Sequence, residues 1–422
     1  NERSIVGCHP PRLGQMKGVL VIIDGMGDIP NKHLGDKTPL EVADTLNMDF
    51  FAARGEMGYM YTVKPGFVPG SDEAIVSLFG NDLLSSSRGQ LEARGTKAKL
   101  TRGDLALRTN FATIDSYEKG NILDRRVGRN LTTEEAEILA KAINRIKIPI
   151  KFEFIPTIQH RGVLILKGGF SDNILGNDAN PNTGKIKTCK VTDDEENSQY
   201  TVNILNELMR KIYDELKDHP VNQDRKKKGF LPANYLLVRG PGIEPPKLKQ
   251  YKKWLSPSYM PLEIGFSLAS GMHTVSFEYP KLKNLDAYEN LWEGLKKACG
   301  FAIKSIKRFE KDYDYVYIHI KETDLPGHDN KPLEKKAMLE YVDKTLIKFL
   351  RKFAPPKKIK VVITADHSTP CKLKNHSDDP VPVLLYNYSL PKERHFNEKE
   401  ARRGSLGKIV GNEFLKKVGF SK

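Results

Sequence analysis

The sequence contains few cysteines, and their spacing does not group them. Four occur among 422 residues, Cys8, Cys189, Cys299 and Cys371, and no two form a C-x-x-C pair. Disulfide-stapled domains and zinc knuckles need clustered cysteines, so neither class is indicated. We expect reduced thiols that are mostly buried.

Long apolar runs are also missing. The longest clear run, residues 18–23, is strand-sized and far below the roughly 20 residues of a membrane-spanning helix. Residues 1–16 lack the apolar centre of a secretory signal, and we take them as an N-terminal extension. We predict no transmembrane segment and a cytoplasmic location. The mitochondrial matrix is the alternative, because the chain is basic and its first residue is Asn1.

Acidic residues are outnumbered by basic ones. The chain has 68 Lys and Arg against 53 Asp and Glu, a formal net charge of +15. Such an excess fits a nucleic acid, a small anionic substrate or a compartment with basic proteins. The densest basic run, residues 225–228, is short and ends beside Gly229, which is typical of a solvated loop. We therefore predict no nucleic-acid partner.

The hydrophobic pattern predicts an α/β fold. Apolar strands alternate with helical patterns, which favours a mostly parallel sheet sandwiched by helices. A chain of this length exceeds what one core usually organises. The strands predicted for this sheet are 18–23, 235–238, 315–320, 358–364 and 383–386, and the helices are 286–309, 332–353 and 397–418.

Residues 95–230 interrupt the alternation. They mix short strands, a helix near 132–144, a polar loop at 171–182, a charged helix near 198–217 and a linker at 220–232. We predict an inserted α+β lid domain over 95–230. The catalytic domain would consist of residues 17–94 and 231–422.

Metal-binding side chains follow three of the predicted strands. Because parallel strands present their carboxyl ends at one edge of a sheet, these side chains should lie close together. Three Asp and three His without Cys suit Mn²⁺, Zn²⁺ or Co²⁺ and suffice for two ions, which can clamp a phosphoryl transfer. The candidate ligands are Asp24, Asp324, His328, Asp366, His367 and His376.

Each of these residues also has a purely structural interpretation. Asp24 before a glycine could be a turn residue, and Asp366 could cap a helix. His319 alternates with apolar residues, so we take it as packing or support for the site. Cys371 lies near the predicted ligands but is not needed as one. The clustering favours the metal site over these alternatives.

Ser71 is the candidate nucleophile. It stands in Pro69-Gly70-Ser71-Asp72-Glu73, a glycine turn before an apolar helical run. A serine at a helix N-terminus lies where backbone N–H groups favour anions, and a covalent acceptor divides phosphoryl transfer into two easier steps. The local pattern alone favours the plainer interpretation that Ser71 is only a helix cap.

Taken together, these motifs resemble the archaeal-type cofactor-independent phosphoglycerate mutases of the alkaline phosphatase superfamily. The resemblance is carried by Asp24-Gly-Met-Gly-Asp, Pro-Gly-Ser71-Asp, Asp324-x-x-Gly-His328-Asp-Asn, Asp366-His367-Ser-Thr-Pro and Asn-His376-Ser. It extends from about residue 17 to near the C-terminus.

The resemblance implies an isomerase that interconverts 3-phosphoglycerate and 2-phosphoglycerate in glycolysis and gluconeogenesis through a phosphoserine on Ser71. Two divalent ions are implied, for which we expect manganese, with cobalt, zinc or magnesium as alternatives. One ion would be surrounded by Asp24, Ser71, Asp366 and His367. The other would be held by Asp324, His328 and His376.

The implied substrate carries a phosphate and a carboxylate, which the planar guanidinium of arginine binds well. The candidate substrate-binding residues are Arg108, Arg125, Arg126, Arg129, Arg161 and Lys321. A solvated basic surface is the alternative interpretation for each.

Two segments depart from the family pattern. Residues 270–284 replace a usually glycine-rich stretch, and residues 85–95 are also altered, so substrate fit and lid contacts are in question. Two alternatives remain open at this point: a metal-dependent phosphatase or phosphonate hydrolase, and a former mutase retained as a structural subunit of a larger assembly. Homo-oligomerisation is equally open.

Overall fold

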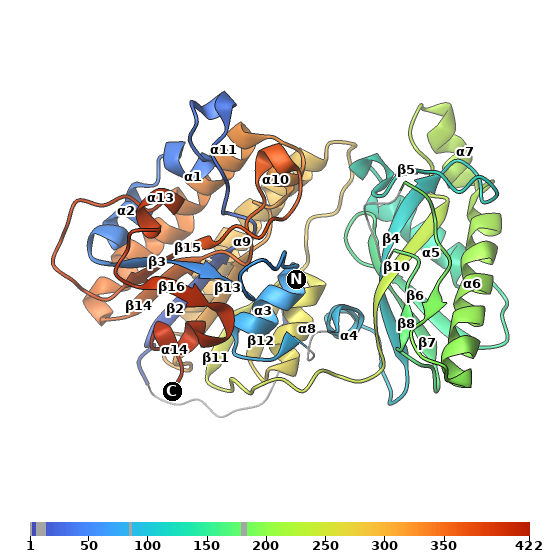
Figure 1. Cartoon of the computed structure of the whole chain (residues 1–422), viewed down its shortest axis with the longest axis horizontal. Helices are drawn as coiled ribbons and strands as arrows, with labels where there is room; N and C mark the ends of the chain where they lie inside the picture. The colour runs from blue at the N-terminus through green and yellow to red at the C-terminus, as the bar shows by residue number, and fades with distance from the viewer. Residues whose placement is uncertain (1, 6–13, 84–86, 179–183) are drawn as a thin grey trace.

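The chain folds around two separate β-sheets, seen on the left and right of Figure 1. The computed structural model describes residues 2–5, 14–83, 87–178 and 184–422. Each sheet has its own hydrophobic cluster of buried side chains. No helix in these ranges is both long enough and apolar enough to cross a membrane.

The larger sheet has nine strands in the order β1-β12-β11-β13-β2-β14-β15-β3-β16. Most neighbours are parallel, which confirms the predicted fold class; the antiparallel pairs are β1/β12, β14/β15 and β15/β3. The strands are β1 Glu2–Ile5, β2 Gly18–Ile23, β3 Gly55–Tyr61, β11 Trp254–Pro257, β12 His273–Phe277, β13 Tyr315–Ile320, β14 Lys360–Thr364, β15 Val381–Tyr386 and β16 Gly407–Val410.

Strand β2 lies at the centre of this sheet because its sequence is apolar throughout. All six residues of Gly-Val-Leu-Val-Ile-Ile are buried, as expected for a strand covered on both faces. Tyr315 of β13 and Lys360 of β14 both pair with Gly18, so the three parallel strands begin at the same level. Their carboxyl ends therefore also meet.

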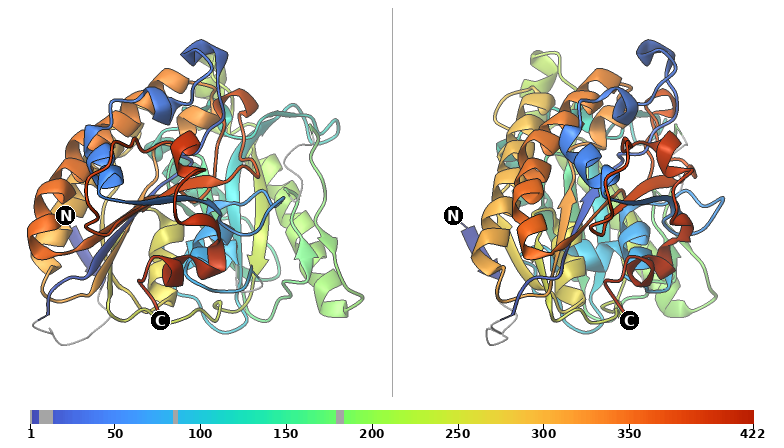
Figure 2. Two further views of the ribbon diagram at one scale, coloured as in Figure 1. Left: turned by 60° about the vertical axis from the view of Figure 1, so that its left-hand side comes forward. Right: turned by 90° about the vertical axis from the view of Figure 1, so that its left-hand side faces the viewer.

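Helices cover both faces of the larger sheet. One layer contains α9, α11 and α12, with a π-helical turn over Asp343–Ile347 between the last two (Figure 2). The opposite layer includes α3 and α8, where Phe79 packs against Phe266 of α8 and Tyr317 of β13. The helices of this unit are α1 Pro39–Val42, α2 Leu46–Ala53, α3 Ser71–Leu78, α4 Arg88–Arg94, α8 Pro261–Ala269, α9 Ala287–Phe309, α10 Leu325–His328, α11 Pro332–Val342, α12 Lys348–Phe353, α13 Glu398–Ala401 and α14 Phe414–Lys417.

The smaller unit packs its helices against a five-stranded antiparallel sheet in the order β10-β4-β7-β6, with β5 paired to β4. A separate two-stranded ribbon joins β8 and β9. The elements are β4 Leu105–Ile114, β5 Ile122–Asp124, α5 Thr133–Ile143, β6 Lys151–Pro156, β7 Arg161–Lys167, β8 Ile174–Leu175, β9 Lys190–Val191, α6 Glu196–Leu216, α7 Pro220–Lys227 and β10 Tyr235–Gly242.

The structure corrects two predicted boundaries. The strand predicted at 235–238 for the larger sheet is β10, which pairs with β4 of the smaller one, so the smaller unit extends to Gly242 instead of ending at 230. Part of the N-terminal extension forms β1, which adds an edge strand beside β12. Cys8 lies outside the described residues, and the other three cysteines are free and buried.

Further corrections concern individual elements. The helix predicted at 397–418 is instead two single turns, α13 and α14, on either side of β16. The predicted linker at 220–232 contains α7, which begins at Pro220. Within the basic run that we took for a solvated loop, Arg225 is fully buried and pairs with Glu135 at 2.8 Å.

The carboxyl of Glu398 makes the stability of the fold depend on pH. Its oxygens accept hydrogen bonds from the Thr38 hydroxyl at 2.7 Å and the Asp28 N–H at 3.1 Å. Burial nevertheless raises the pKa of Glu398 to about 7 from an ordinary 4.5. The folded state therefore holds this proton more tightly than the unfolded state. The contribution of Glu398 to stability is fully present below about pH 4.5 and is lost as pH rises to about 7.

We expect Glu398→Gln, which cannot ionise, to become progressively more stable relative to the parent protein between pH 4.5 and 7. Over this pH range the free energy of unfolding of the variant should rise, relative to that of the parent, by up to about 3 kcal/mol. Urea unfolding of both proteins at several pH values measures it. A difference that stays constant over this range would contradict the raised pKa.

Candidate metal centre and nucleophile

The candidate ligands lie where three neighbouring parallel strands end. Asp24 directly follows β2, Asp324 lies four residues after β13, and Asp366 lies two residues after β14. These strands are adjacent in the order β13-β2-β14. The loops are also joined directly, because the Gly25 N–H donates to Asp366 Oδ1 at 3.0 Å.

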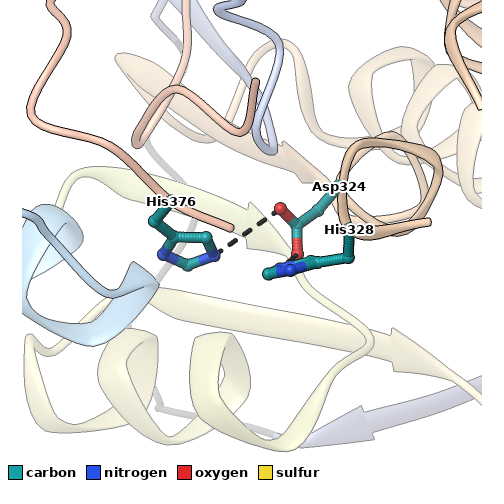
Figure 3. A group of neighbouring side chains, drawn as sticks. All are labelled: Asp324, His328 and His376. Carbon is teal, nitrogen blue, oxygen red and sulfur yellow. Dashed lines mark ion pairs between the residues drawn. The ribbon is translucent and has the colours of Figure 1, made fainter. Parts of the chain in front are cut away.

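One candidate group consists of Asp324, His328 and His376. Asp324 Oδ2 lies 3.1 Å from His328 Nε2, and its Oδ1 lies 3.6 Å from His376 Nε2 (Figure 3). The other ring nitrogens are held by the chain, since His328 Nδ1 contacts the Lys374 carbonyl and His376 Nδ1 contacts the Pro69 carbonyl. Those contacts leave both Nε2 atoms directed toward the Asp324 carboxylate.

The second group lies deeper and contains Asp24, Asp366 and His367. His367 Nε2 lies 3.1 Å from Asp24 Oδ1 and 3.3 Å from Asp366 Oδ2. Burial alone would lower the pKa of His367, but the Asp366 and Asp24 carboxylates outweigh it and raise the pKa to about 9. Burial and the neighbouring Asp366 both raise the pKa of Asp24. Carboxylates crowded at a buried site in this way favour a bound cation.

Ser71 is the first residue of α3 and lies beside this second group. Its Oγ donates to Asp366 Oδ2 at 2.8 Å and lies 3.3 Å from His367 Nε2. The preceding cap is Gly70, whose N–H donates to Glu73. The Ser71 side chain therefore makes no cap hydrogen bond of its own, so capping does not explain its place. Its hydroxyl faces the acid–imidazole cluster instead.

Lys321 adds a cation next to the nucleophile. Its ammonium lies 3.3 Å from Ser71 Oγ, 2.5 Å from Asp24 Oδ2 and 2.7 Å from Glu263 Oε1. Burial would lower the pKa of Lys321, but Asp24 and Glu263 raise it well above its usual value. This lysine remains charged beside Ser71.

Sequence reasoning missed Glu263 and gave His319 only a supporting role. Glu263 is buried in the first turn of α8, the helix that directly follows β11, and His319 Nε2 lies 3.3 Å from Asp366 Oδ2. An acidic residue soon after a strand of a parallel sheet was an available signal for Glu263. His319 carried no comparable signal, because a histidine within an apolar strand is usually core packing.

The donor atoms present fit divalent ions. Three groups bring their donor atoms within 4.8 Å of one another: Asp324 with His328 and His376, Asp24 with Asp324 and His367, and Asp24 with His319 and Asp366. Asp24 Oδ1 and His319 Nε2 are buried without a hydrogen-bond partner, although each faces an ion-pair partner. Carboxylate oxygens and imidazole nitrogens suit borderline divalent cations.

Lys335 of α11 joins the loop that follows β2 to the loop that follows β14. It is completely buried, and its ammonium donates to Asp28 Oδ2 at 2.9 Å, the Gly27 carbonyl at 3.2 Å and the Thr369 carbonyl at 3.1 Å. One side chain thus fixes the loop after β2 against the loop after β14.

Four of the predicted substrate-binding arginines form a cationic group on the smaller unit. Burial and the nearby Arg129 and Arg161 lower the pKa of Arg126 to about 10. Burial, Arg239 and Arg88 lower the pKa of Arg108 well below its usual range, and Arg161 adds to the effect, although Glu92, 3.4 Å from Arg108 Nε, opposes it. Guanidiniums held this close together repel one another, and an anion placed among them relieves that repulsion.

Arg129 connects this group to the larger unit. It pairs with Asp329 at 2.7 Å, and Asp329 directly follows the candidate ligand His328. Arg125 pairs with Asp178 inside the smaller unit. The structure therefore brings Arg126, Arg129 and Arg161 near one another, with Arg108 near Arg161.

Known proteins resemble the chain over nearly its whole length. A family model described as 2,3-bisphosphoglycerate-independent phosphoglycerate mutase matches residues 52–222. The protein of that name from Pyrococcus furiosus is 40% identical over 408 residues, which cover 95% of this chain and 96% of that protein. Its counterpart from Thermococcus kodakarensis is 39% identical over 406 residues, which cover 94% and 95%. The chain belongs to this mutase family.

Solved structures extend the likeness to the fold. A Pyrococcus horikoshii protein superimposes with a TM-score of 0.73 at 31% identity, covering 97% of this chain and 99% of that one. A cofactor-independent phosphoglycerate mutase from Thermoplasma acidophilum gives 0.57 at 26% identity, covering 96% and 99%. Membership of the mutase family therefore applies to both units of the chain.

Proposed function

We propose that the chain interconverts 3-phosphoglycerate and 2-phosphoglycerate through a phosphoserine on Ser71. The observation that carries the proposal is the Ser71 hydroxyl, 2.8 Å from Asp366 and beside two groups of acid and imidazole donors. Family membership supports the same activity.

In the first half-reaction, Ser71 Oγ attacks the phosphorus of 3-phosphoglycerate and the bond to the substrate's O3 breaks. The hydroxyl proton of Ser71, already directed at Asp366, passes to that carboxylate and from there to the departing glycerate oxygen. In the second half-reaction the 2-hydroxyl of glycerate takes the phosphoryl group, and its proton returns through Asp366 to the oxygen of Ser71. The N-terminus of α3 and the Lys321 ammonium stabilise the negative charge on the transferring group.

The smaller unit would act as a lid. Its arginine group would bind the carboxylate and phosphate of the substrate, and closure over the metal centre would exclude water from the phosphoserine. Without that exclusion the same chemistry would release phosphate. The chain runs between the two units only near residues 95–104 and 243–253 of its described part, where hinges would lie.

Two divalent ions complete the proposed site. Asp24, Ser71, Asp366 and His367 would hold one ion, and Asp324, His328 and His376 would hold the other. We expect Mn²⁺, with Co²⁺, Zn²⁺ or Mg²⁺ as alternatives. Such ions supply Lewis-acid stabilisation of phosphoryl oxygens and favour ionisation of a bound hydroxyl.

Ser71→Ala should reduce turnover by at least 10³-fold while the melting temperature stays close to that of the parent, because the phosphoryl acceptor is lost. Conversion of 3-phosphoglycerate is followed by NMR, which separates 2-phosphoglycerate from free phosphate. Ser77→Ala, on the same helix, is the control and should retain activity. Parental turnover in Ser71→Ala would place the nucleophile elsewhere, and phosphate as the main product would indicate a phosphatase.

Metal content provides a test that does not depend on activity. The parent protein, stripped with chelator and dialysed against Mn²⁺, should contain two ions per chain by elemental mass spectrometry. Asp324→Ala should contain at most one, because Asp324 belongs to two donor groups. His395→Ala should still contain two, since His395 pairs with Asp49 away from the site. Equal metal content in the parent and Asp324→Ala would refute the ligand assignment.

The two neighbouring arginines Arg125 and Arg126 allow a matched comparison. We expect Arg126→Ala to raise the KM for 3-phosphoglycerate at least tenfold, because it removes a guanidinium that senses the charge of Asp324 and that we assign to the substrate. Arg125→Ala should change KM less than threefold, because Arg125 pairs with Asp178. Steady-state kinetics decide, and equal effects of the two substitutions would remove Arg126 from the substrate site.

A further inference from the structure

Two short segments carry most of the net charge of the chain. Residues 294–311 contain six Lys or Arg and one acidic residue, and residues 344–360 contain seven and none. Together they hold a net charge of +12, out of +15 for the whole protein. The sequence alone does not reveal this concentration, because more than thirty residues separate the two segments.

Folding places the two segments side by side. They comprise the second half of α9 with the turn after it, and the helix that ends with α12 together with the turn that leads into β14. The two helices run in one layer over the larger sheet (Figure 2). Lys307 of α9 lies over the Phe349 ring of α12 with its ammonium 5.5 Å from the ring centre, and Lys357 pairs with Glu310. We call the exposed cationic side of these segments the basic face.

The cations of the basic face are largely unneutralised. Within the described part of the chain, carboxylates lie within 4.0 Å of only three of the thirteen: Lys297, Lys344 and Lys357. Nine of the remaining ten side chains are exposed: Lys296, Lys304, Lys307, Arg308, Lys311, Lys348, Arg351, Lys352 and Lys358. Such an arrangement is unfavourable by itself and attracts a partner with many negative charges.

The basic face offers charge without apolar anchors. No large hydrophobic side chain is exposed within residues 294–311 or 344–360. Protein partners usually dock on a buried aromatic or aliphatic centre, and stable membrane association needs an inserted apolar group in addition to basic residues. A phosphodiester backbone needs neither, since Lys and Arg spread along a helix bind it by charge.

The basic face lies away from the candidate metal centre. The turns after α9 and α12 lead into the first residues of β13 and β14, whereas the candidate ligands follow the carboxyl ends of those strands. A large partner bound there would leave the active edge open. From Lys296 to Lys311 the basic stripe is about 22 Å long, which is about the length of six or seven base pairs.

We propose that the basic face binds the backbone of a nucleic-acid duplex without reading its sequence. The proposal reverses our prediction from the sequence that the chain has no nucleic-acid partner. That prediction rested on the densest basic run, residues 225–228, alone. It is independent of the proposed mutase activity, because no residue of the basic face belongs to that site.

Fluorescence anisotropy tests the proposal with the full chain and a labelled random-sequence 20-base-pair duplex, measured from 50 to 200 mM salt. The parent should bind with an affinity that falls steeply as salt rises. The combined variant Lys304→Gln, Lys307→Gln, Lys348→Gln, Lys352→Gln should bind at least tenfold more weakly, with a shallower salt slope. Replacing the same four lysines by arginine should preserve binding, and mutase turnover should be unchanged in both.

The matched control removes the same charge from the smaller unit through Lys187→Gln, Lys190→Gln, Lys226→Gln and Lys227→Gln, all at exposed positions. It should bind within twofold of the parent. Equal weakening in the two glutamine variants would mean attraction by net charge alone and would overturn the proposal. Absence of duplex binding at 50 mM salt would also overturn it, as would binding confined to vesicles of anionic lipid.

Discussion

The shared register of β2, β13 and β14 is the constraint on which the rest of the site depends. The three strands start level at Gly18, Tyr315 and Lys360, so their carboxyl ends form one edge. Polar side chains hundreds of residues apart in sequence meet at that edge only because this pairing holds. A slip of one residue would turn each buried strand over and separate the donors from one another.

Holding so many charges together at that edge is unfavourable, and the surrounding chain offsets it. Lys321 is placed between Asp24 and Glu263, and Lys335 joins the loops after β2 and β14 from beneath. Removing one partner of such a buried pair leaves the other charge exposed to an apolar interior, which typically costs about 3–5 kcal/mol. These lysines therefore hold the loops and carboxylates of the site in position, in addition to neutralising their negative charge.

Local patterns predicted the elements that a single apolar periodicity determines. Strand β2 and helix α9, with its cap at Asp286, are where the hydrophobic spacing places them. The prediction of one helix over 397–418 was wrong, because its apolar residues belong to two short helical turns and to β16. The pairing of β16 with β3 sets this division. Strand β10 was assigned to the wrong sheet, since an apolar strand does not reveal which partner it will join.

The sequence predicted the part of the candidate site that consists of motifs directly after strands. Asp24, Asp324 and Asp366 follow strands and meet as expected. Glu263 also comes soon after a strand, but it was missed because it belongs to none of the motifs. Arg125 could not be distinguished from Arg126 by sequence. The pairing of Arg125 with Asp178 is set by the tertiary fold and could not be read from the sequence. The role of these side chains as ligands stays a prediction.

The location of the basic residues at the opposite end of the strands from the donors has an evolutionary consequence. Substitutions in the outer turns of α9 and α12 change surface charge without moving β2, β13 or β14, because only the inner sides of those helices pack on the sheet. Selection can therefore act on the two ends separately. A lineage could acquire or discard a charged surface within a few mutations while its catalytic residues stay the same.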